Sequence, residues 1–521
     1  MSRQKYIRVI PKLDIKGPNL VKGIHLEGLR VLGKPEDFAF EYYITGADEL
    51  IYIDLVASLY GRSNLIEIVQ RIADKIFIPL TVGGGIRSLD DMHQLLRAGA
   101  DKLAMNTALF EDISLLQKGS FTYGAQCMVV YIEAKKNPVG EYECMHTNAR
   151  ENSGVKVRDW VSQVESAGAG EIFLTFVDTE GTACGVDDAF VKEVSQHVDI
   201  PVVVNGGFGK TGHMIDAVSS GADAISAASM FHYHKLERMR DASKDESEGN
   251  RAFIDLTRSR NASFLAGKIT PVSIGETKSA MMSKGFSCRS DSDDESGYQF
   301  IKIDRKRSVT IVDYGMGNMF SLARALKKIG ATVTVTNTIE DIKKAAHIIL
   351  PGVGAFHRAM ENLSEENLIS PIREHVKKGN PILGVCLGMQ LLFSQSEEIA
   401  VSKGLDLLEG KITRLFNKSS GGCKLPHIGW NRLTQNKDGS ARLWAQSIFK
   451  NIDNRCFAYF VHSFALCDPD NSSMLSLTEY GETVFCSAVQ KENISGCQFH
   501  PELSGVTGLK ILTAYLESAT K

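Results

Sequence analysis

The chain contains 521 residues, of which 43% are hydrophobic and 23% are charged, so the composition predicts a globular protein with two or more well-buried cores. A net charge of −3 gives no electrostatic reason to expect nucleic acid or an anionic membrane as a partner. No apolar run approaches the length of about 18 residues that a membrane-spanning helix needs, and the N-terminus lacks the apolar core of a signal peptide. Ten cysteines without close pairing are typical of reduced thiols. We therefore expect a cytoplasmic enzyme.

Residues 6 to about 231 alternate strand-like apolar runs with amphipathic stretches of helical period. Eight such runs begin near Ile7, Glu49, Phe77, Asp101, Gln126, Glu171, Pro201 and Asp223. Eight β/α units of this length favour a closed (β/α)8 barrel over a doubly wound sheet. A repeat supports the barrel, because Gly84-Gly85 recurs as Gly206-Gly207, and Asp14-Ile15-Lys16 recurs as Glu133-Ala134-Lys135. The mouth of the barrel should therefore have near two-fold symmetry.

Each half of the predicted barrel has a Gly-Gly turn after an odd-numbered strand and small residues at the end of the next strand. These residues are Gly84, Gly85, Asn106 and Thr107 in the first half, and Gly206, Gly207, Ala228 and Ser229 in the second. Glycines that let backbone N–H groups approach an anion, beside a hydroxyl and a helix N-terminus, predict a phosphate site. Two copies predict a substrate with a phosphate at each end. The alternative is that the glycines only make tight βα turns.

Two carboxylates are expected between these phosphate sites. Asp14 and Glu133 stand at the C-terminal ends of the first and fifth strands, where they would face each other. Such a pair can serve as general acid and general base. Taken singly, each could instead be a surface or salt-bridged carboxylate.

At the opposite ends of the strands, four charged residues are expected around the bottom of the barrel. Arg8, Glu49, Lys102 and Glu171 begin the first, second, fourth and sixth strands. Two positive and two negative groups around a narrow opening can close a ring of salt bridges, which we call the charged ring. The alternative role of the charged ring is stability alone, because the bottom face of such barrels usually serves stability.

Residues 235 to 307 are polar, charged and poor in apolar residues over much of their length. This composition predicts a solvated insertion at about 235–270 and a linker at 288–307. Between them, 273–286 is expected to form the last barrel helix. We therefore expect one domain at 1–287 and a second at 308–521, with 309–312 as its first strand and a doubly wound α/β sheet.

The second domain contains a candidate nucleophile, Cys386. An apolar run leads into Gly384-Val385-Cys386-Leu387-Gly388, which is followed by a helix-like stretch. A sharp strand-to-helix turn with glycine on both sides is the geometry of a nucleophile elbow, and it would expose the sulfur at a helix N-terminus that favours thiolate. Farther along the chain, His500 can take the thiol proton and Glu502 can orient the imidazole ring. The alternative, a buried structural cysteine, leaves this pair unexplained.

These motifs resemble class I (triad) glutamine amidotransferases, specifically the glutaminase subunit of imidazole glycerol phosphate synthase. The resemblance covers 308–521 and rests on the segments 313–318, 351–354, 384–390, 427–431, 459–463 and 500–502. It implies glutamine as substrate, a glutamyl thioester on Cys386, and ammonia passed onward. It also implies that Gly352, Val353 and Gly354 supply the oxyanion site, and that Gln390 contributes to glutamine binding.

The first half resembles the cyclase subunit of the same synthase over residues 6 to about 234. The segments that carry this resemblance are 13–16, 21–23, 81–87, 99–102, 106–107 and 231–232. It implies that ammonia joins a bis-phosphorylated ribulosyl formimino-aminoimidazole carboxamide ribotide. The implied products are imidazole glycerol phosphate and the aminoimidazole carboxamide ribotide, with Asp14 and Glu133 as acid and base. The charged ring matches the family's gate for ammonia, and neither a cofactor nor a metal is expected.

Three positions depart from the cyclase pattern. Glu133 and Glu180 replace the usual aspartates, and Asn205 stands where serine is common. These changes are more similar to cyclase-like paralogues of surface-polysaccharide gene clusters, which are thought to pass ammonia to a separate sugar-amidinating enzyme. The sequence therefore leaves two acceptors open: the ribotide, or a sugar-modifying partner enzyme for which the barrel only conducts ammonia.

Overall fold

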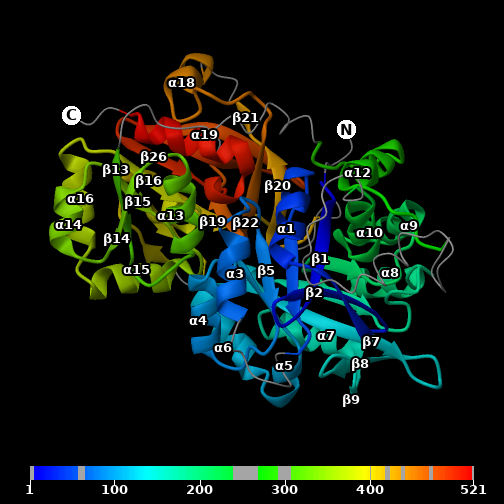
Figure 1. Cartoon of the computed structure of the whole chain (residues 1–521). Helices are drawn as coiled ribbons and strands as arrows, with labels where there is room; N and C mark the ends of the chain where they lie inside the picture. The colour runs from blue at the N-terminus through cyan, green and yellow to red at the C-terminus, as the bar shows by residue number, and fades with distance from the viewer. Residues whose placement is uncertain are drawn as a thin grey trace. The chain divides into compact units, whose positions relative to one another are not determined.

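A computed structural model of the chain describes residues 5–56, 65–238, 268–290, 307–398, 401–416, 423–435, 440–468 and 473–518. Contacts divide the chain into two compact units, one formed mainly by residues 6–119 and 127–291 and the other mainly by residues 292–521. Both units combine helices with β-sheet (Figure 1). None of the helices within the described ranges is long and apolar enough to cross a membrane.

A closed barrel of eight parallel strands forms the first unit, as predicted. The strands are β1 (Arg8–Lys16), β4 (Leu50–Asp54), β5 (Leu80–Gly83), β6 (Lys102–Met105), β7 (Met128–Lys136), β10 (Glu171–Phe176), β11 (Val202–Asn205) and β12 (Ala224–Ala227). They pair in chain order, and β12 pairs in parallel with β1 to close the barrel. Each strand begins within about three residues of the start that its apolar run indicated.

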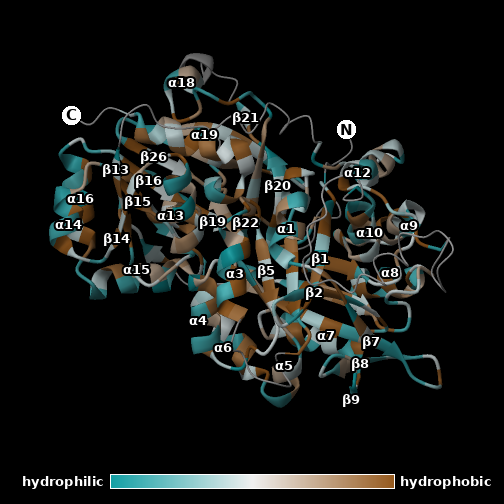
Figure 2. Cartoon of the chain, viewed as in Figure 1, coloured by the Kyte–Doolittle hydropathy of each residue, from teal (hydrophilic) through white to brown (hydrophobic). Residues whose placement is uncertain are grey.

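Helices cover the outside of the barrel, and their hydrophilic sides show as teal in Figure 2. They are α1 (Pro35–Ile44), α3 (Leu65–Ala73), α4 (Leu89–Arg97), α5 (Thr107–Glu111), α6 (Ser114–Tyr123), α7 (Val157–Ser166), α8 (Asp188–His197), α9 (Thr211–Ser219), α10 (Ser229–Arg238) and α12 (Ile274–Ser283). Helix α12 is the last barrel helix expected from 273–286, and Ser273 with Glu276 forms a capping box at its start. Most of the expected insertion, 239–267, lies outside the described residues.

The two-fold repeat appears as two antiparallel hairpins at the barrel mouth. Strands β2 (Asn19–Ile24) and β3 (Glu27–Gly33) follow β1, while β8 (Tyr142–His146) and β9 (Glu151–Lys156) follow β7. The hairpins meet where the side-chain amide of Asn148 donates to the backbone oxygen of Leu26 (3.2 Å). The carboxylates at 14 and 133 each stand just before one of these hairpins.

Alternation along the strands fills the barrel interior. On β1, the side chains of Arg8, Ile10, Lys12 and Asp14 share one face because they are two residues apart. Ile10 belongs to a buried apolar cluster together with residues from β4, β6, β7, β10, β11 and β12. The interior is therefore apolar in the middle and carries charged side chains toward both ends.

The first residues of the expected linker are buried in the barrel unit. Arg289 Nε lies 2.9 Å from Asp48 Oδ1, and Lys278 Nζ lies 2.8 Å from the same oxygen. Asp48 also accepts from the backbone N–H of Val9, and the backbone of Ser287 accepts from that of Ile7. The chain leaving α12 is thus held against the start of β1 as far as Arg289.

An eight-stranded mixed sheet forms the centre of the second unit. Its order is β14 (Thr332–Thr336), β13 (Ser308–Val312), β15 (Ile348–Leu350), β16 (Ile382–Val385), β26 (Ile494–Cys497), β25 (Thr483–Lys491), β24 (Met474–Tyr480) and β21 (Thr434–Gln435). The first five strands are parallel and the last three extend the sheet in antiparallel fashion. Smaller sheets contain β17 (Phe393–Ser396), β18 (Ser402–Lys403), β19 (Leu408–Arg414) and β23 (Phe464–Leu466), and β20 (His427–Arg432) with β22 (Phe457–His462).

The helices of this unit form two groups, as a doubly wound sheet requires. Helices α14 (Ile339–Lys344), α15 (Phe356–Glu365) and α16 (Ile369–Lys377) contribute to one large apolar core, whereas α13 (Met319–Lys328) packs against α19 (Gly505–Leu516). The chain runs from β13 out to β14 and then returns to β15 on the other side of β13. Loops after β13 and β15 therefore lie at the topological switch point, where ligands of such sheets bind.

Candidate functional site

Cys386 occupies the predicted elbow between β16 and α17 (Leu387–Leu391). Its φ is 51°, in the left-handed region that non-glycine residues rarely adopt. A Cβ on Gly388 would lie 1.8 Å from the backbone oxygen of Leu350, and one on Gly384 would lie 2.6 Å from that of Gly388. Both glycines are thus required by close backbone packing. The expectation of an exposed sulfur is wrong, because Cys386 is only 3% exposed.

His500 and Glu502 complete the arrangement expected from the sequence. The His500 ring donates from Nδ1 to Glu502 Oε1 (2.8 Å), so Nε2 is the ring nitrogen available to a thiol. Burial alone would lower the pKa of His500, but the Glu502 carboxylate and the Cys386 sulfur raise it well above its usual value. Both residues are about 5% exposed. The three side chains therefore form a buried, mutually interacting set.

Two further groups contact the Cys386 sulfur. The side-chain amide of Gln498 donates to Sγ (3.7 Å), and Sγ lies 3.8 Å from the backbone oxygen of Val461. Gln390 contacts Gln498 (3.1 Å) and the backbone oxygen of Phe464 (2.8 Å). The sequence did not single out Gln498, which follows the end of β26 at Cys497.

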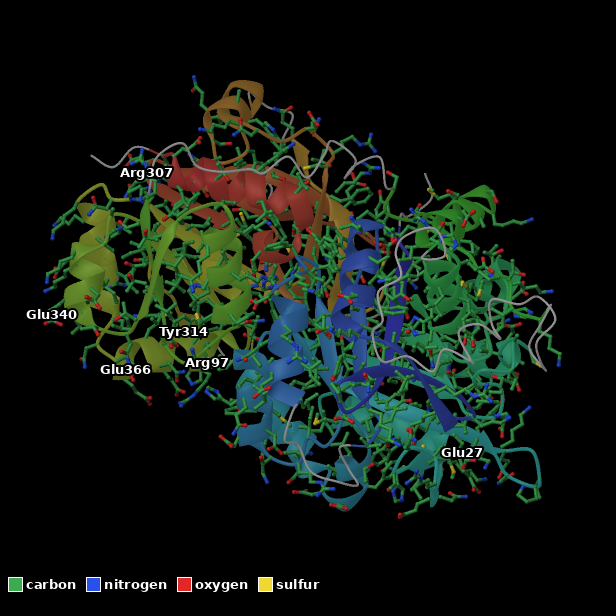
Figure 3. The ribbon with its side chains drawn as sticks, viewed as in Figure 1. Glu27, Arg97, Arg307, Tyr314, Glu340 and Glu366 are labelled. Carbon is green, nitrogen blue, oxygen red and sulfur yellow. The ribbon has the colours of Figure 1, made fainter. Side chains whose placement is uncertain are left out.

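The Gly352–Gly354 turn lies beside the elbow. A Cβ on Gly352 would approach the Tyr314 hydroxyl at 2.4 Å and Leu387 at 3.1 Å. Tyr314, labelled in Figure 3, donates its hydroxyl to the backbone oxygen of Pro351 (2.6 Å). This bond holds the turn after β15 against the loop after β13, next to Cys386. Val353 lies between the two glycines of this turn.

In the barrel, Asp14 and Glu133 have different environments. Lys12 Nζ lies 2.8 Å from Asp14 Oδ1, whereas Glu133 Oε2 accepts from the backbone N–H of Ala149 (2.8 Å). Burial raises the pKa of Glu133 to about 7, although the Ala149 N–H and Lys12 oppose that shift. The sequence missed Lys12 and the Ala149 amide. Alternation on β1 was the available signal for Lys12, because it stands two residues before Asp14.

The other two departures from the cyclase pattern also lie at this end of the barrel. Glu180 forms a buried ion pair with Lys22, and the pKa of Glu180 is lowered because Lys22 and Lys12 outweigh the effect of burial. In the orientation that satisfies both ends of its amide, Asn205 donates to the backbone oxygen of Ser226 and accepts from the N–H of Gly206. Asn205 is therefore tied to the second Gly-Gly turn.

The first set of predicted phosphate ligands surrounds a pocket. Gly84, Gly85, Asn106 and Thr107 line it together with Glu133. Asn106 and Thr107 stand at the start of α5, and Gly84 and Gly85 follow β5. The structure therefore brings one candidate anion site and one candidate catalytic carboxylate to the same cavity.

The second set follows β11 and β12. Gly206 and Gly207 form the turn after β11, while Ala228 follows β12 and Ser229 begins α10. A Cβ on Gly207 would lie 2.0 Å from the backbone oxygen of Gly185. Only glycine therefore fits this turn, which the loop before α8 covers closely.

The charged ring is present at the start of the strands. Arg8 contacts Glu49 (2.9 Å) and Glu171 (2.6 Å), and Lys102 contacts Glu49 (2.6 Å) and Glu171 (2.7 Å). All four side chains are at most 2% exposed. Each cation thus bridges both carboxylates, and the ring of salt bridges closes.

Comparisons with known proteins match each half of the chain. A family model described as histidine biosynthesis protein matches residues 8–237, and one described as glutamine amidotransferase class-I matches residues 310–515. The imidazole glycerol phosphate synthase subunit HisF of Legionella pneumophila is 56% identical over 204 residues, which are 39% of this chain and 96% of that protein. The chain belongs to the imidazole glycerol phosphate synthase family.

Two further HisF subunits of this synthase family match the same half. That of Corynebacterium diphtheriae is 43% identical and that of Bifidobacterium adolescentis is 42% identical, each over 236 residues that cover 44% of this chain and 92% of the relative. The chain thus joins a HisF-type synthase barrel to a class I glutamine amidotransferase domain, as predicted. It is an enzyme of glutamine-dependent ammonia transfer in histidine biosynthesis, and it uses glutamine and a phosphorylated substrate.

Proposed function

We propose that Cys386 is the nucleophile of the glutaminase reaction. His500 takes the thiol proton through Nε2, the sulfur attacks the side-chain amide carbon of glutamine, and ammonia leaves with a proton returned by the ring. Water then hydrolyses the glutamyl thioester to glutamate. The hydrogen bond from His500 to Glu502 carries this assignment, because it fixes the tautomer that leaves Nε2 free for the thiol.

The Gly352–Gly354 turn would stabilise the oxyanion formed during this attack. Its position against Leu387 places it next to the elbow, and backbone N–H groups are suitable donors to a developing negative charge. The contact between Gln390 and Gln498 supports a role for Gln390 in shaping the glutamine site, since Gln498 itself contacts the sulfur.

In the barrel, we propose that ammonia reacts with a bis-phosphorylated ribulosyl formimino-aminoimidazole carboxamide ribotide. The products would be imidazole glycerol phosphate and the aminoimidazole carboxamide ribotide. Asp14 and Glu133 would serve as the acid–base pair, and the two Gly-Gly turns would hold the phosphates. The cavity that joins the first turn to Glu133 supports this assignment.

The charged ring would control the passage of ammonia into the barrel. Ammonia is neutral and small, whereas the closed ring of four buried charges leaves a narrow, highly polar constriction at the bottom of the strands. Opening of one salt bridge would widen this constriction. Replacement of Lys102 should then change the ratio of glutamine consumed to product formed.

A second acceptor is favoured by one observation. The three departures at Glu133, Glu180 and Asn205 all lie at the same end of the barrel, and a carboxylate that is displaced by about 1 Å can lose about a hundredfold in rate. In that case the barrel would conduct ammonia to a separate sugar-amidinating enzyme and would not cleave the ribotide.

The test uses the full chain with the ribotide and either glutamine or ammonium salt. The variant Cys386→Ala should lose glutamine hydrolysis and keep ammonia-dependent ribotide turnover, while Cys467→Ala, which removes a half-buried thiol of the same domain, should keep both. Glutamine turnover near the parent rate in Cys386→Ala would contradict the nucleophile assignment.

An assay of the unaltered protein distinguishes the two acceptors of ammonia. Loss of the ribotide chromophore with ammonium salt supports the cyclase reaction, and Glu133→Asp should then preserve or raise the rate. A persistent chromophore alongside intact glutaminase activity would contradict the cyclase reaction and support the conducting barrel.

A further inference from the structure

Lys12 is a buried cation inside the barrel that the function proposed above does not use. Its side chain is 0% exposed, and Nζ lies 2.8 Å from Asp14 Oδ1 and 5.6 Å from the centre of the Tyr131 ring. An isolated charge at such a position costs several kcal/mol, whereas an apolar residue, such as Ile10 on the same face of β1, costs nothing. Lys12 therefore needs an explanation beyond packing.

The contacts of Lys12 make the two candidate catalytic carboxylates unequal. Asp14 has the ammonium group at ion-pair distance, whereas Glu133 is held by the neutral N–H of Ala149. Both carboxylates are at most 2% exposed, so water does little to screen the charge of Lys12 from either of them. A cation at contact distance favours the ionised form of a carboxylate, while burial without one favours the protonated form.

The remaining charged and titratable groups around the pair are Lys22, Glu180, His25, His232 and Tyr131. Lys22 pairs with Glu180, and although burial raises the pKa of Glu180, Lys22, Lys12 and His25 together lower it. Burial and the nearby lysines lower the pKa of His232 to about 3, which keeps its ring neutral. Burial raises the pKa of Tyr131 well above its usual value, so its phenol is also neutral.

We infer that Lys12 is a positioning residue that keeps Asp14 ionised, so that Asp14 is the base and Glu133 the acid of the barrel reaction. This inference rests on the proposed cyclase function. When the nitrogen of ammonia bonds to a carbonyl carbon, the nitrogen gives up one proton and the carbonyl oxygen gains one. Asp14 accepts the first proton and Glu133 supplies the second, so the pair keeps one proton in total. The raised pKa of Glu133, about 7, agrees with this division.

The first test reads the protonation of the carboxylates directly and needs no turnover. Infrared difference spectra of the full chain near pH 6 should show a protonated carboxyl band that Glu133→Gln removes and Asp14→Asn does not. Lys12→Met should add a second protonated carboxyl band, because an opposite charge in contact typically shifts carboxylate titration by about 1 to 3 pH units. Lys12→Met spectra identical to those of the parent would overturn the inference.

The second test measures the pH dependence of ribotide turnover per concentration of free ammonia. In Lys12→Met the acidic limb of kcat/KM should move upward by at least about one pH unit, while KM for the ribotide changes little. An unmoved limb would show that Lys12 has only a packing role. If the parent protein does not turn over the ribotide, the proposed cyclase function fails, and the infrared result still decides the role of Lys12.

A folding control covers the case in which Lys12→Met is unstable. The double variant Lys12→Met/Asp14→Asn removes both charges together. Recovery of folding in the double variant would show that the buried Asp14 carboxylate, left without the charge of Lys12, caused the defect, as the inference requires. A double variant as unstable as the single one would show that Lys12 acts through its volume and would overturn the inference.

Discussion

Replacement of Lys102 tests whether the charged ring is a closed network of buried salt bridges. Lys102 is 1% exposed and contacts both Glu49 and Glu171. The variant Lys102→Met keeps most of the side-chain volume but leaves Arg8 as the only counter-charge within the ring for two buried carboxylates. Breaking a buried pair in this way typically destabilises a protein by about 3 to 5 kcal/mol.

The pH dependence sharpens this prediction. Burial raises the pKa of Glu49, but Arg8 and Lys102 outweigh burial and hold it below its usual value. The ring therefore stabilises the parent above the ordinary carboxylate pKa, and this contribution is lost as the pH falls through the lowered pKa. In Lys102→Met one carboxylate must bind a proton to fold. From an ordinary pKa of about 4.3, this costs about 4 kcal/mol at pH 7 and about 1 kcal/mol at pH 5.

The assay is urea unfolding, monitored by hydrogen–deuterium exchange of peptides from β6 and β7. Exchange of these peptides reports on the barrel alone. A matched control is Lys156→Met, because Lys156 forms a half-exposed pair with Glu141 and should show no measurable change. The double variant Lys102→Met/Glu49→Gln should recover most of the lost stability, since Arg8 and Glu171 then balance. A loss below about 1 kcal/mol at both pH values would refute the reasoning.

Two further predictions concern the glutaminase domain. Glu502→Gln should lower glutaminase activity at least about a hundredfold. It should also lower the pKa of His500, because Glu502 is the main group that raises this pKa. NMR of labelled histidine measures the pKa of His500, and an unchanged value would contradict the assigned pair. Gly388→Ala should disrupt the elbow, because the added Cβ would lie 1.8 Å from the backbone oxygen of Leu350, whereas Gly212→Ala should be tolerated, because the nearest atom to its Cβ would be 3.8 Å away. Glutaminase activity and thermal unfolding of both variants are the measurements. A fully active Gly388→Ala would refute the packing argument.

Much of the fold followed from local patterns. The eight barrel strands were predicted because apolar runs and turn residues act within a few positions of each other, and the repeat of the Gly-Gly turns gave the two-fold symmetry. The class of the second domain followed in the same way from Cys386 between two glycines and from His500 with Glu502. Such motifs are short enough that neighbouring residues fix their geometry.

The environment of each site depended on contacts between residues that are far apart in sequence. The sequence placed Cys386 at an elbow, but only the packing of β22 and β26 around it made the sulfur buried. The burial of Arg289 against Asp48 likewise joins residues 241 positions apart, and nothing in the polar stretch that follows α12 indicated it. Composition describes a segment alone, whereas burial depends on what packs against it.

The sequence by itself determined where the eight barrel strands lie, which residues stand at their ends and which chemical groups are available, but not the two hairpins β2–β3 and β8–β9. Strand alternation also fixes that Lys12 and Asp14 share one face. Only the tertiary structure decided that Lys12 pairs with Asp14 and that the Ala149 amide reaches Glu133. The reason is physical: residue type and period set the direction of a side chain from its own strand, but the charge state of a buried group depends on distances of a few ångströms, which are set by how the barrel closes.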